Sequence, residues 1–343
     1  MPDIISSETV LEADKVTRLF DVSRPWLQRV LARESRQTLR AVDEVSFAIA
    51  KGTTLSLVGE SGCGKSTVAR LAVGLYPPSS GSMRFEGANL SAARARPELR
   101  RRMNMIFQDP YASLNPRWRV RDIVAEPIRA FRILRSRRDV ADRVGQLLEQ
   151  VGLSARDGEK FPHEFSGGQR QRISIARALS SEPDFLVADE PTSALDVSVQ
   201  AQILNLLRDL QGRMRLTFLF ISHNLAVVRH VTDQLGVMYL GRIVEYGPGE
   251  SIFTAPRHPY TRLLLDAIPD LGMTGRPRTP VGGEVPSPID PPAGCTFHPR
   301  CPFAFVRCKF ERPGYTRDGD VLVACHAVEE GRIEPHEARP SAA

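Results

Sequence analysis

The chain has 343 residues, enough for one large core or two modest ones, and its 42% hydrophobic and 25% charged content is ordinary for a soluble globular protein. No run approaches the roughly eighteen apolar residues of a membrane-spanning helix, and the N-terminal stretch MPDIISSETV lacks the pattern of a signal peptide, so we expect a cytoplasmic chain. The net charge of +6 suits an anionic partner, and it suits a solvated basic surface equally well.

Residues 52–75 predict a strand, a glycine-rich loop and a helix in that order. Residues 55–58 form an apolar run, residues 59–64 cannot continue a strand, and apolar side chains then recur at helical spacing as far as Leu75. This is the context that the phosphate-loop pattern G-x-x-x-x-G-K-[ST] requires. Lys65 would reach the β- and γ-phosphates, and the Ser66 hydroxyl would bind Mg²⁺.

The loop's expected nucleotide-binding residues are Gly59, Ser61, Gly62, Cys63, Gly64, Lys65, Ser66 and Thr67. Small residues let the backbone N–H groups close around the phosphates, and the helix N-terminus adds positive potential. Cys63 stands at a variable position of the pattern, as a small filler residue or, alternatively, as a redox-sensing thiol.

A second helix start that favours anions is predicted near residue 166. The preceding segment reads as helical, with one apolar face formed by Val140, Val144, Leu147, Leu148 and Val151. Ser166 and Gln169 then form a capping-box pattern, and Gly167 and Gly168 leave the backbone N–H groups bare. Because residues 59–65 already supply one phosphate site, a second one suggests that two chains sandwich the nucleotide.

Two further strands are predicted to end in polar side chains. The apolar run 185–188 leads to Asp189, which would hold Mg²⁺, and to Glu190, placed to act as a general base on water. A helical stripe at 203–210 precedes the strand 215–222, which leads to His223. Alternating strands and helices imply an α/β core with a largely parallel sheet.

In kind and order, these motifs resemble those of the ATP-binding subunit of an ABC transporter. GESGCGKST is similar to the Walker A loop, FSGGQ to the signature, FLVADE to Walker B and SALD to the D-loop. The resemblance implies an α/β fold: a RecA-like P-loop ABC nucleotide-binding domain with a helical subdomain, plus a cysteine-containing C-terminal extension. Its divisions would be residues 1–110 and 169–250 for the ATPase core, 111–168 for the helical subdomain and 251–343 for the extension.

The resemblance also implies roles for residues that would mean little alone. Gln108 resembles the Q-loop glutamine, which ligates Mg²⁺ or the lytic water and reports the state of the membrane subunits. His223 resembles the switch histidine at the γ-phosphate. Phe20 lies where the family stacks an aromatic ring on adenine, with Trp26 as a rival. The implied catalytic set is Lys65, Gln108, Glu190 and His223, and the implied second wall of each ATP site is Ser166, Gly167, Gly168, Gln169 and Asp196.

The residues beyond 250 resemble the C-terminal extension of the oligopeptide, dipeptide and nickel importers. Two stretches carry this resemblance: HPYTRLLLDAIP and GEVPSPIDPPAGCTFHPRC. Other stretches look most like the F-type subunit of the two ATPases in that subfamily. This implies a different but homologous ATPase partner, two permease subunits, a substrate-binding protein acting from outside, no nucleic acid, and a place on the cytoplasmic face of the membrane. Nickel or glutathione import, an ABC exporter and a soluble ABC ATPase on nucleic acid or the ribosome are the alternatives.

Four of the five cysteines lie in this tail, at Cys295, Cys301, Cys308 and Cys325. Structural zinc favours tighter C-x₂₋₄-C pairs, and four thiolates can hold an iron–sulfur cluster. Some members of the resembled subfamily carry a [4Fe–4S] cluster here, so we expect one, with zinc or no metal as alternatives. His298 and His326 flank the thiols. The role of the cluster would be to staple together an extension that has little hydrophobic core of its own.

The basic insert 23–38 around Trp26 is expected to be a solvated loop.

Overall fold

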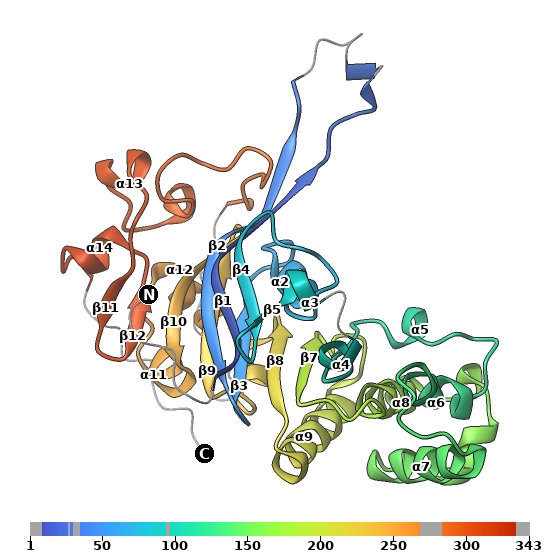
Figure 1. Cartoon of the computed structure of the whole chain (residues 1–343). Coiled ribbons are helices and arrows are strands. Elements are labelled where there is room, and N and C mark those ends of the chain that lie inside the picture. The colour runs from blue at the N-terminus through green and yellow to red at the C-terminus, as the bar shows by residue number, and fades with distance from the viewer. Residues whose placement is uncertain (1–8, 27, 30–34, 94–96, 268–282, 334–343) are drawn as a thin grey trace.

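The computed structural model describes residues 9–26, 28–29, 35–93, 97–267 and 283–333. Within them, a mixed sheet forms the centre of the molecule, with the helical subdomain on one side and the C-terminal extension on the other (Figure 1). None of the helices in these ranges is long and apolar enough to cross a membrane.

The central sheet has the strand order β11-β12-β10-β9-β3-β8-β7-β6. The strands are β3 (Thr54–Val58), β6 (Met103–Ile106), β7 (Phe185–Asp189), β8 (Thr217–Ser222), β9 (Gln234–Tyr239), β10 (Arg242–Pro248), β11 (Thr316–Asp318) and β12 (Val321–Val323). The stretch from β9 to β6 is parallel, as the sequence predicts. Every residue of β3, β7 and β8 is buried, which explains why their sequences read as continuous apolar runs.

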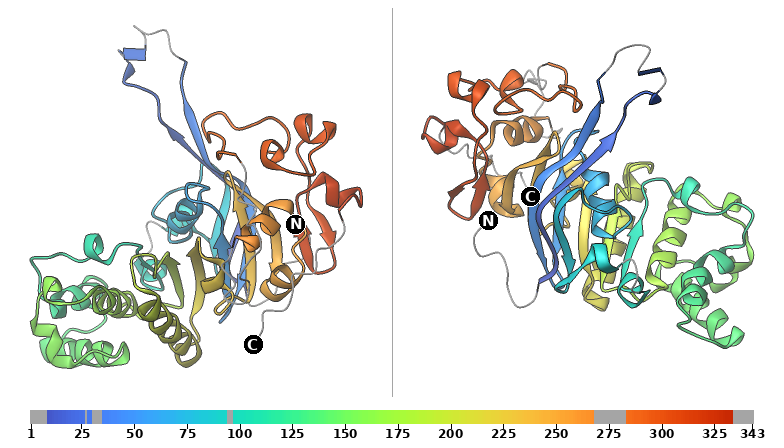
Figure 2. Two further views of the ribbon diagram at one scale, coloured as in Figure 1. Left: turned by 180° about the vertical axis from the view of Figure 1, so that it is seen from behind. Right: turned by 45° about the horizontal axis from the view of Figure 1, so that its top comes forward.

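A second, antiparallel sheet of order β2-β1-β4-β5 forms from the N-terminal third of the chain. Its strands are β1 (Thr9–Asp21), β2 (Thr38–Ala50), β4 (Ser80–Phe85) and β5 (Ala88–Asn89). The β1–β2 ribbon runs past the end of the sheet into an arm (Figure 2). The predicted insert lies there: Trp26 is 67% exposed, whereas residues 27 and 30–34 lie outside the described part.

Outside the helical subdomain and the C-terminal extension, the helices that the described ranges contain beside the sheets are α2 (Lys65–Ala72), α3 (Leu90–Ala93), α4 (Pro97–Arg101), α9 (Val197–Met214), α10 (Leu225–Val228) and α11 (Gly249–Thr254). Helix α2 ends before Leu75, three residues earlier than the sequence predicts. Gly74 has φ +68°, and the Leu75 N–H donates to the carbonyl of Arg70, which together close the helix.

The helical subdomain holds α5 (Pro110–Ser113), α6 (Val120–Ala130), α7 (Arg137–Gln150), η1 (Ala155–Glu159), η2 (Pro162–Glu164) and the start of α8 (Gly167–Leu179). The predicted apolar face of α7 is buried. Ser166 and Gln169 form the predicted capping box: each side chain bonds to the other residue's backbone N–H. The helix of the signature therefore begins where the sequence places it.

The C-terminal extension differs from the expectation of a loop-rich segment with little core. It contains α12 (Pro259–Asp266), η3 (His298–Arg300), α13 (Val306–Phe310), α14 (His326–Glu329) and strands β11 and β12. Strand β12 pairs with β10 and so continues the central sheet. Phe297, Val321 and Val323 are buried in the same cluster as the core strands. The extension thus shares the hydrophobic core of the central sheet instead of needing a staple.

Candidate functional site: a phosphate loop and three strand ends

A cavity of about 860 Å³ lies where the carboxyl ends of the parallel strands meet. The loop after β3 forms its floor, and Gln108, Glu190 and His223 reach it from the segments that follow β6, β7 and β8. The predicted phosphate loop, Q-loop glutamine, Walker B glutamate and switch histidine are therefore brought together in one site.

Glycines shape the phosphate loop because their neighbours leave no room for a side chain. A Cβ on Gly59 would lie 2.1 Å from the Met238 carbonyl oxygen, and a Cβ on Gly64 would lie 2.2 Å from the Ala41 carbonyl oxygen. Both glycines, and Gly62, also have positive φ angles. The β3–α2 turn can therefore pass close to β2 and β9 and open its backbone to the cavity.

Lys65 opens helix α2 and its side chain is almost wholly buried. Its ammonium group donates to the carbonyl oxygens of Gly59 at 2.7 Å and Glu60 at 2.9 Å. The ammonium group thus lies inside its own loop, on the floor of the cavity that phosphates would fill.

The side-chain oxygens of Ser66 and Asp189 lie together, and Ser66 directly follows Lys65 in the chain. The Ser66 hydroxyl donates to Asp189 Oδ1 at 3.0 Å. Burial raises the pKa of the Asp189 carboxyl, Glu190 adds to the rise, and the Ser66 hydrogen bond opposes it. A hydroxyl and a carboxylate are hard oxygen donors of the kind that Mg²⁺ takes alongside phosphate oxygens, so the residues fit this ion.

Glu190 stands at the centre of a three-residue contact. Its Oε2 accepts from Gln108 Nε2 at 3.0 Å and lies 3.1 Å from His223 Nδ1. Its φ of +47° is unusual for a residue with a side chain, and its N–H donates to the Ile221 carbonyl. A carboxylate held in this way, facing the phosphate loop, can accept a proton from water.

Phe20 and Cys63 have different surroundings. Phe20 lines the cavity and packs edge-on to Tyr76, with the Arg18 guanidinium 4.7 Å above its ring, whereas Trp26 is not part of the lining. Cys63 is buried within the loop, 3.6 Å from the Lys65 ammonium, and burial raises the pKa of its thiol. Its side chain therefore packs behind the loop, as a filler residue does.

The signature residues and Asp196 are not part of this lining. Ser166 and Gln169 lie at the start of α8 and Asp196 caps α9. A Cβ on Gly168 would lie 2.5 Å from Val199, which fixes the close packing of α8 on α9. In the described part of the chain, these residues therefore lie away from the cavity beside Lys65.

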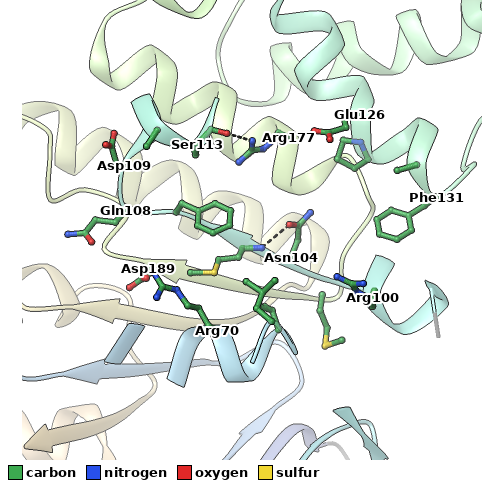
Figure 3. A pocket seen from close by; sticks show the side chains of 18 residues that line it. Arg70, Arg100, Asn104, Gln108, Asp109, Ser113, Glu126, Phe131, Arg177 and Asp189 are labelled. Atoms are coloured by element: carbon green, nitrogen blue, oxygen red, sulfur yellow. Dashed lines mark hydrogen bonds between the residues drawn. The ribbon is translucent and has the colours of Figure 1, made fainter. Parts of the chain in front are cut away.

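A second cavity, of about 730 Å³, lies between the central sheet and the helical subdomain. Figure 3 shows Gln108 and Asp189 at one end of it and Glu126 and Phe131 at the other. Gln108 lines both cavities. This glutamine therefore lies at the boundary between the two cavities.

The four tail cysteines share one region but do not form a metal site. In the part of the chain that is described, no group of three or more His, Cys, Asp or Glu side chains is arranged to hold a metal ion. Burial raises the pKa of the Cys295 thiol to about 11 and that of Cys301 to about 12, and nearby thiols add to both shifts. The arrangement of the described side chains therefore does not support the predicted [4Fe–4S] cluster or zinc ion.

Sequence reasoning did not predict that the extension contributes to the cavity beside Lys65. Leu264 and Pro288 line it, and Tyr260 and Arg300 bond to Glu60 of the phosphate loop. The paired residues are 200 and 240 positions apart, and no local pattern in the sequence joins them.

Comparison with known proteins agrees with this geometry. The family described as "ABC transporter" matches residues 42–193, and "Oligopeptide/dipeptide transporter, C-terminal region" matches residues 244–308. The di/tripeptide transport ATP-binding protein DppF of Pseudomonas aeruginosa (strain UCBPP-PA14) is 48% identical over 94% of this chain and 99% of its own. The oligopeptide transport ATP-binding protein AppF of Bacillus subtilis (strain 168) is 46% identical over 94% and 98%.

Solved structures show the same fold at lower identity. A dimeric ATP-binding cassette in a post-hydrolysis state, bound to ADP and phosphate, has a TM-score of 0.60 and 24% identity, covering 69% of this chain and 98% of that one. The protein cbiO1 of Clostridium perfringens, part of the ABC transporter complex cbiONQ, has a TM-score of 0.58 and 24% identity, covering 72% of this chain and 91% of that one.

The RecA-like sheet and its phosphate loop thus define a P-loop ATPase of the ABC type. At this identity and coverage, the chain belongs to the ATP-binding proteins of ABC transporters, in the branch with the oligopeptide/dipeptide C-terminal region. As the sequence predicts, it is an enzyme that binds and hydrolyses ATP.

Proposed function

We propose that this chain is the ATP-hydrolysing subunit of an importer of di- or oligopeptides. The observation that carries the proposal is the contact of Glu190 with both Gln108 and His223 in the cavity that holds Lys65. The relatives named for di/tripeptide and oligopeptide transport match the chain along nearly its whole length, which supports peptides over nickel or glutathione as the cargo.

The phosphate loop and its two oxygen ligands bind the nucleotide in this proposal. Lys65 exchanges the carbonyls of Gly59 and Glu60 for the β- and γ-phosphate oxygens. Ser66 and Asp189 hold Mg²⁺, which neutralises phosphate charge when bound. Phe20 stacks on the adenine, since its ring lies at the wall of the same cavity.

Three side chains act on the attacking water. Glu190 accepts its proton as general base, Gln108 orients it, and His223 contacts the γ-phosphate. The hydrogen bond from Gln108 and the close contact with His223 hold Glu190 in place before the nucleotide arrives. Water adds to the γ-phosphorus as the bond to ADP breaks, so the products are ADP and phosphate.

Two chains complete each ATP site. The helix start at Ser166–Gln169 does not line the cavity of its own chain, so it is available to contact the nucleotide of another chain. We place the signature and Asp196 of one subunit against the phosphate loop of a homologous second ATPase. Mixing this chain with that subunit and ATP should give one dimer by light scattering, and a Ser166→Arg variant should stay monomeric.

The permease subunits would dock on the second cavity, at the seam between the core and the helical subdomain (Figure 3). Its lining combines apolar Phe107 and Phe131 with charged Glu126 and Arg177, and burial lowers the pKa of the Arg177 guanidinium. Such a mixed lining suits a polypeptide segment with both apolar and polar side chains. Gln108 would pass the docked segment's movement to Glu190. The chain would then work as a peripheral subunit on the cytoplasmic face of the membrane.

The tail cysteines enter this proposal as packing groups. Protein purified without oxygen should contain less than one equivalent of iron, sulfide or zinc for each chain. Iron and sulfide in stoichiometric amounts, lost in Cys301→Ser, would restore the cluster that the sequence predicts.

Uptake into sealed vesicles tests the function. Vesicles that hold this ATPase, its partner, two permease subunits and the binding protein should accumulate labelled di- and tripeptides only with ATP. Failure to move any peptide, with nickel or glutathione moved instead, would contradict the cargo. Salt-sensitive binding of RNA or DNA, with no transport, would favour the soluble ABC ATPase, and outward movement of cargo would favour an exporter.

A further inference from the structure

Glu60 is an acidic residue inside the phosphate loop, and the C-terminal extension holds it at two points. Its carboxylate accepts two hydrogen bonds from Arg300, at 2.7 Å to Nη1 and 2.9 Å to Nη2. Its backbone N–H donates to the Tyr260 hydroxyl at 2.9 Å. Both partners come from the extension, so the loop that binds phosphate is tied to a segment outside the nucleotide-binding core.

Arg300 is fixed on its own side as well. Its side chain is 3% exposed, whereas that of Glu60 is 25% exposed. The guanidinium lies 5.8 Å from the centre of the Tyr239 ring, and Nη1 is 3.4 Å from the Tyr239 hydroxyl. Phe297, three residues earlier, is buried against Tyr239 and Tyr260 at ring-centre distances of 5.2 and 5.4 Å. These contacts hold Arg300 at the end of the η3 turn, and its bidentate hydrogen bonds set the orientation of the Glu60 carboxylate.

The location of Glu60 gives this ion pair a consequence for the nucleotide. Glu60 lines the ATP cavity, and its carbonyl oxygen holds the Lys65 ammonium at 2.9 Å. An unpaired carboxylate at this place would repel the phosphates and would compete with them for Lys65. With Arg300 bound, the carboxylate is neutralised and turned to the extension.

We propose that Arg300 is a positioning residue for ATP: by binding Glu60 it removes a negative charge from the phosphate site and lets the C-terminal extension set the enzyme's affinity for ATP. The inference rests on the proposed ATPase function and adds to it a control point outside the nucleotide-binding core. Any change that moves the η3 turn would alter ATP affinity through this one contact.

Nucleotide binding by the full chain tests the proposal, measured by calorimetry with ATP and with ADP at fixed Mg²⁺. Arg300→Met should bind ATP about tenfold more weakly, and ADP should be affected less because it carries less phosphate charge. In steady-state assays KM for ATP should rise with little change in kcat. Glu60→Gln should bind ATP at least as tightly as the wild type, since it removes the repelling charge.

The double variant separates charge from packing. Glu60→Gln combined with Arg300→Met should bind ATP within about threefold of the wild type, because neither charge is left unpaired. Arg307→Met is the matched control: it loses ion pairs to Glu311, Glu329 and Glu330 inside the extension and has no contact with the phosphate loop. Its ATP affinity should equal that of the wild type.

Several outcomes would overturn the proposal. Arg300→Met with wild-type affinity would remove Arg300 from nucleotide binding. A double variant as weak as Arg300→Met would mean that the contact only packs the extension. If Arg300→Met does not fold, a tenfold loss in Glu60→Gln alone would count against the charge argument. Loss of ATP binding by the wild type would instead reject the ATPase function itself, so the two failures are distinct.

Discussion

In the proposed mechanism, nucleotide affinity depends most directly on Lys65. Its ammonium group is buried and donates to two carbonyl oxygens of the loop, at the floor of the cavity. Lys65→Ala should therefore weaken ATP binding at least about tenfold, by loss of a charge-assisted contact to phosphate. Lys160→Ala, which alters an exposed lysine paired with Asp157, is the control and should bind ATP normally. Unchanged affinity in Lys65→Ala would reject the phosphate-loop assignment.

The burial of His258 predicts that the free energy of unfolding decreases in acid. His258 is fully buried, its Nδ1 accepts from the Tyr260 N–H, and burial lowers its pKa from 6.5 to about 3, with Arg262 adding to the shift. Between these two pH values, His258 is protonated in the unfolded chain but stays neutral in the folded chain. The stabilisation is therefore complete above pH 6.5 and is lost as the pH falls towards 3.

The measurement is urea unfolding of the wild type and His258→Asn across this pH window. Asparagine keeps an acceptor for the Tyr260 N–H but does not titrate. The wild-type free energy of unfolding should fall faster with acid, by up to about 1.4 kcal/mol for each pH unit. Equal slopes in the two proteins would show that His258 does not titrate in this way.

At the scale of elements, much could be predicted because the signals are local. The capping box at Ser166 and Gln169, the run 185–188 and the stripe on α7 each lie within one helix or strand, and the structure confirms all three. The end of α2 at Ala72 was missed because the apolar stripe continues to Leu75 while Gly74 turns the backbone. Local turn geometry overrode the periodicity.

The core of the extension could not be predicted, because its contacts span long distances along the chain. Strand β12 is three residues long and pairs with β10, so its sequence alone is too short to indicate a strand. The four cysteines drew attention to metal chemistry, whereas the extension folds by burying Phe297, Val321 and Val323 against the central core.

Phe297→Ala tests this view of the extension. The ring is 1% exposed and packs on Tyr239, Tyr260 and His258, so its removal leaves a cavity and should cost about 3–5 kcal/mol of unfolding free energy. Phe310→Ala, in the same extension but 80% exposed, should cost less than about 0.5 kcal/mol. Similar denaturant midpoints for the two variants would mean that the extension is not part of the core.

For the whole molecule, the order of motifs in the sequence predicts the class of enzyme and the strand ends at which its site forms. Gln108, Glu190 and His223 are far apart in the chain, yet each follows a parallel strand, so the sheet brings them together. No comparable rule of sheet topology predicts the contact between the phosphate loop and Arg300, so only the structure reveals it.

The proposed dimer divides the site between two chains. One subunit would supply Lys65, Glu190 and His223, and its signature helix start would contact the nucleotide held by the partner. A subunit that binds ATP but cannot activate water should therefore remain closed on its partner. This is the state in which the role of Glu190 can be isolated from that of the phosphate loop.

The most direct test of the account is single-turnover hydrolysis by the wild type and Glu190→Gln, together with their affinity for ATP. Glutamine keeps the shape of Glu190 and a hydrogen bond to Gln108 but cannot accept a proton. We predict unchanged ATP affinity, an ATP-stabilised dimer with the partner ATPase, and hydrolysis slowed at least about a hundredfold. Wild-type hydrolysis in Glu190→Gln would contradict the assignment of Glu190 as the base and with it the mechanism proposed for this site.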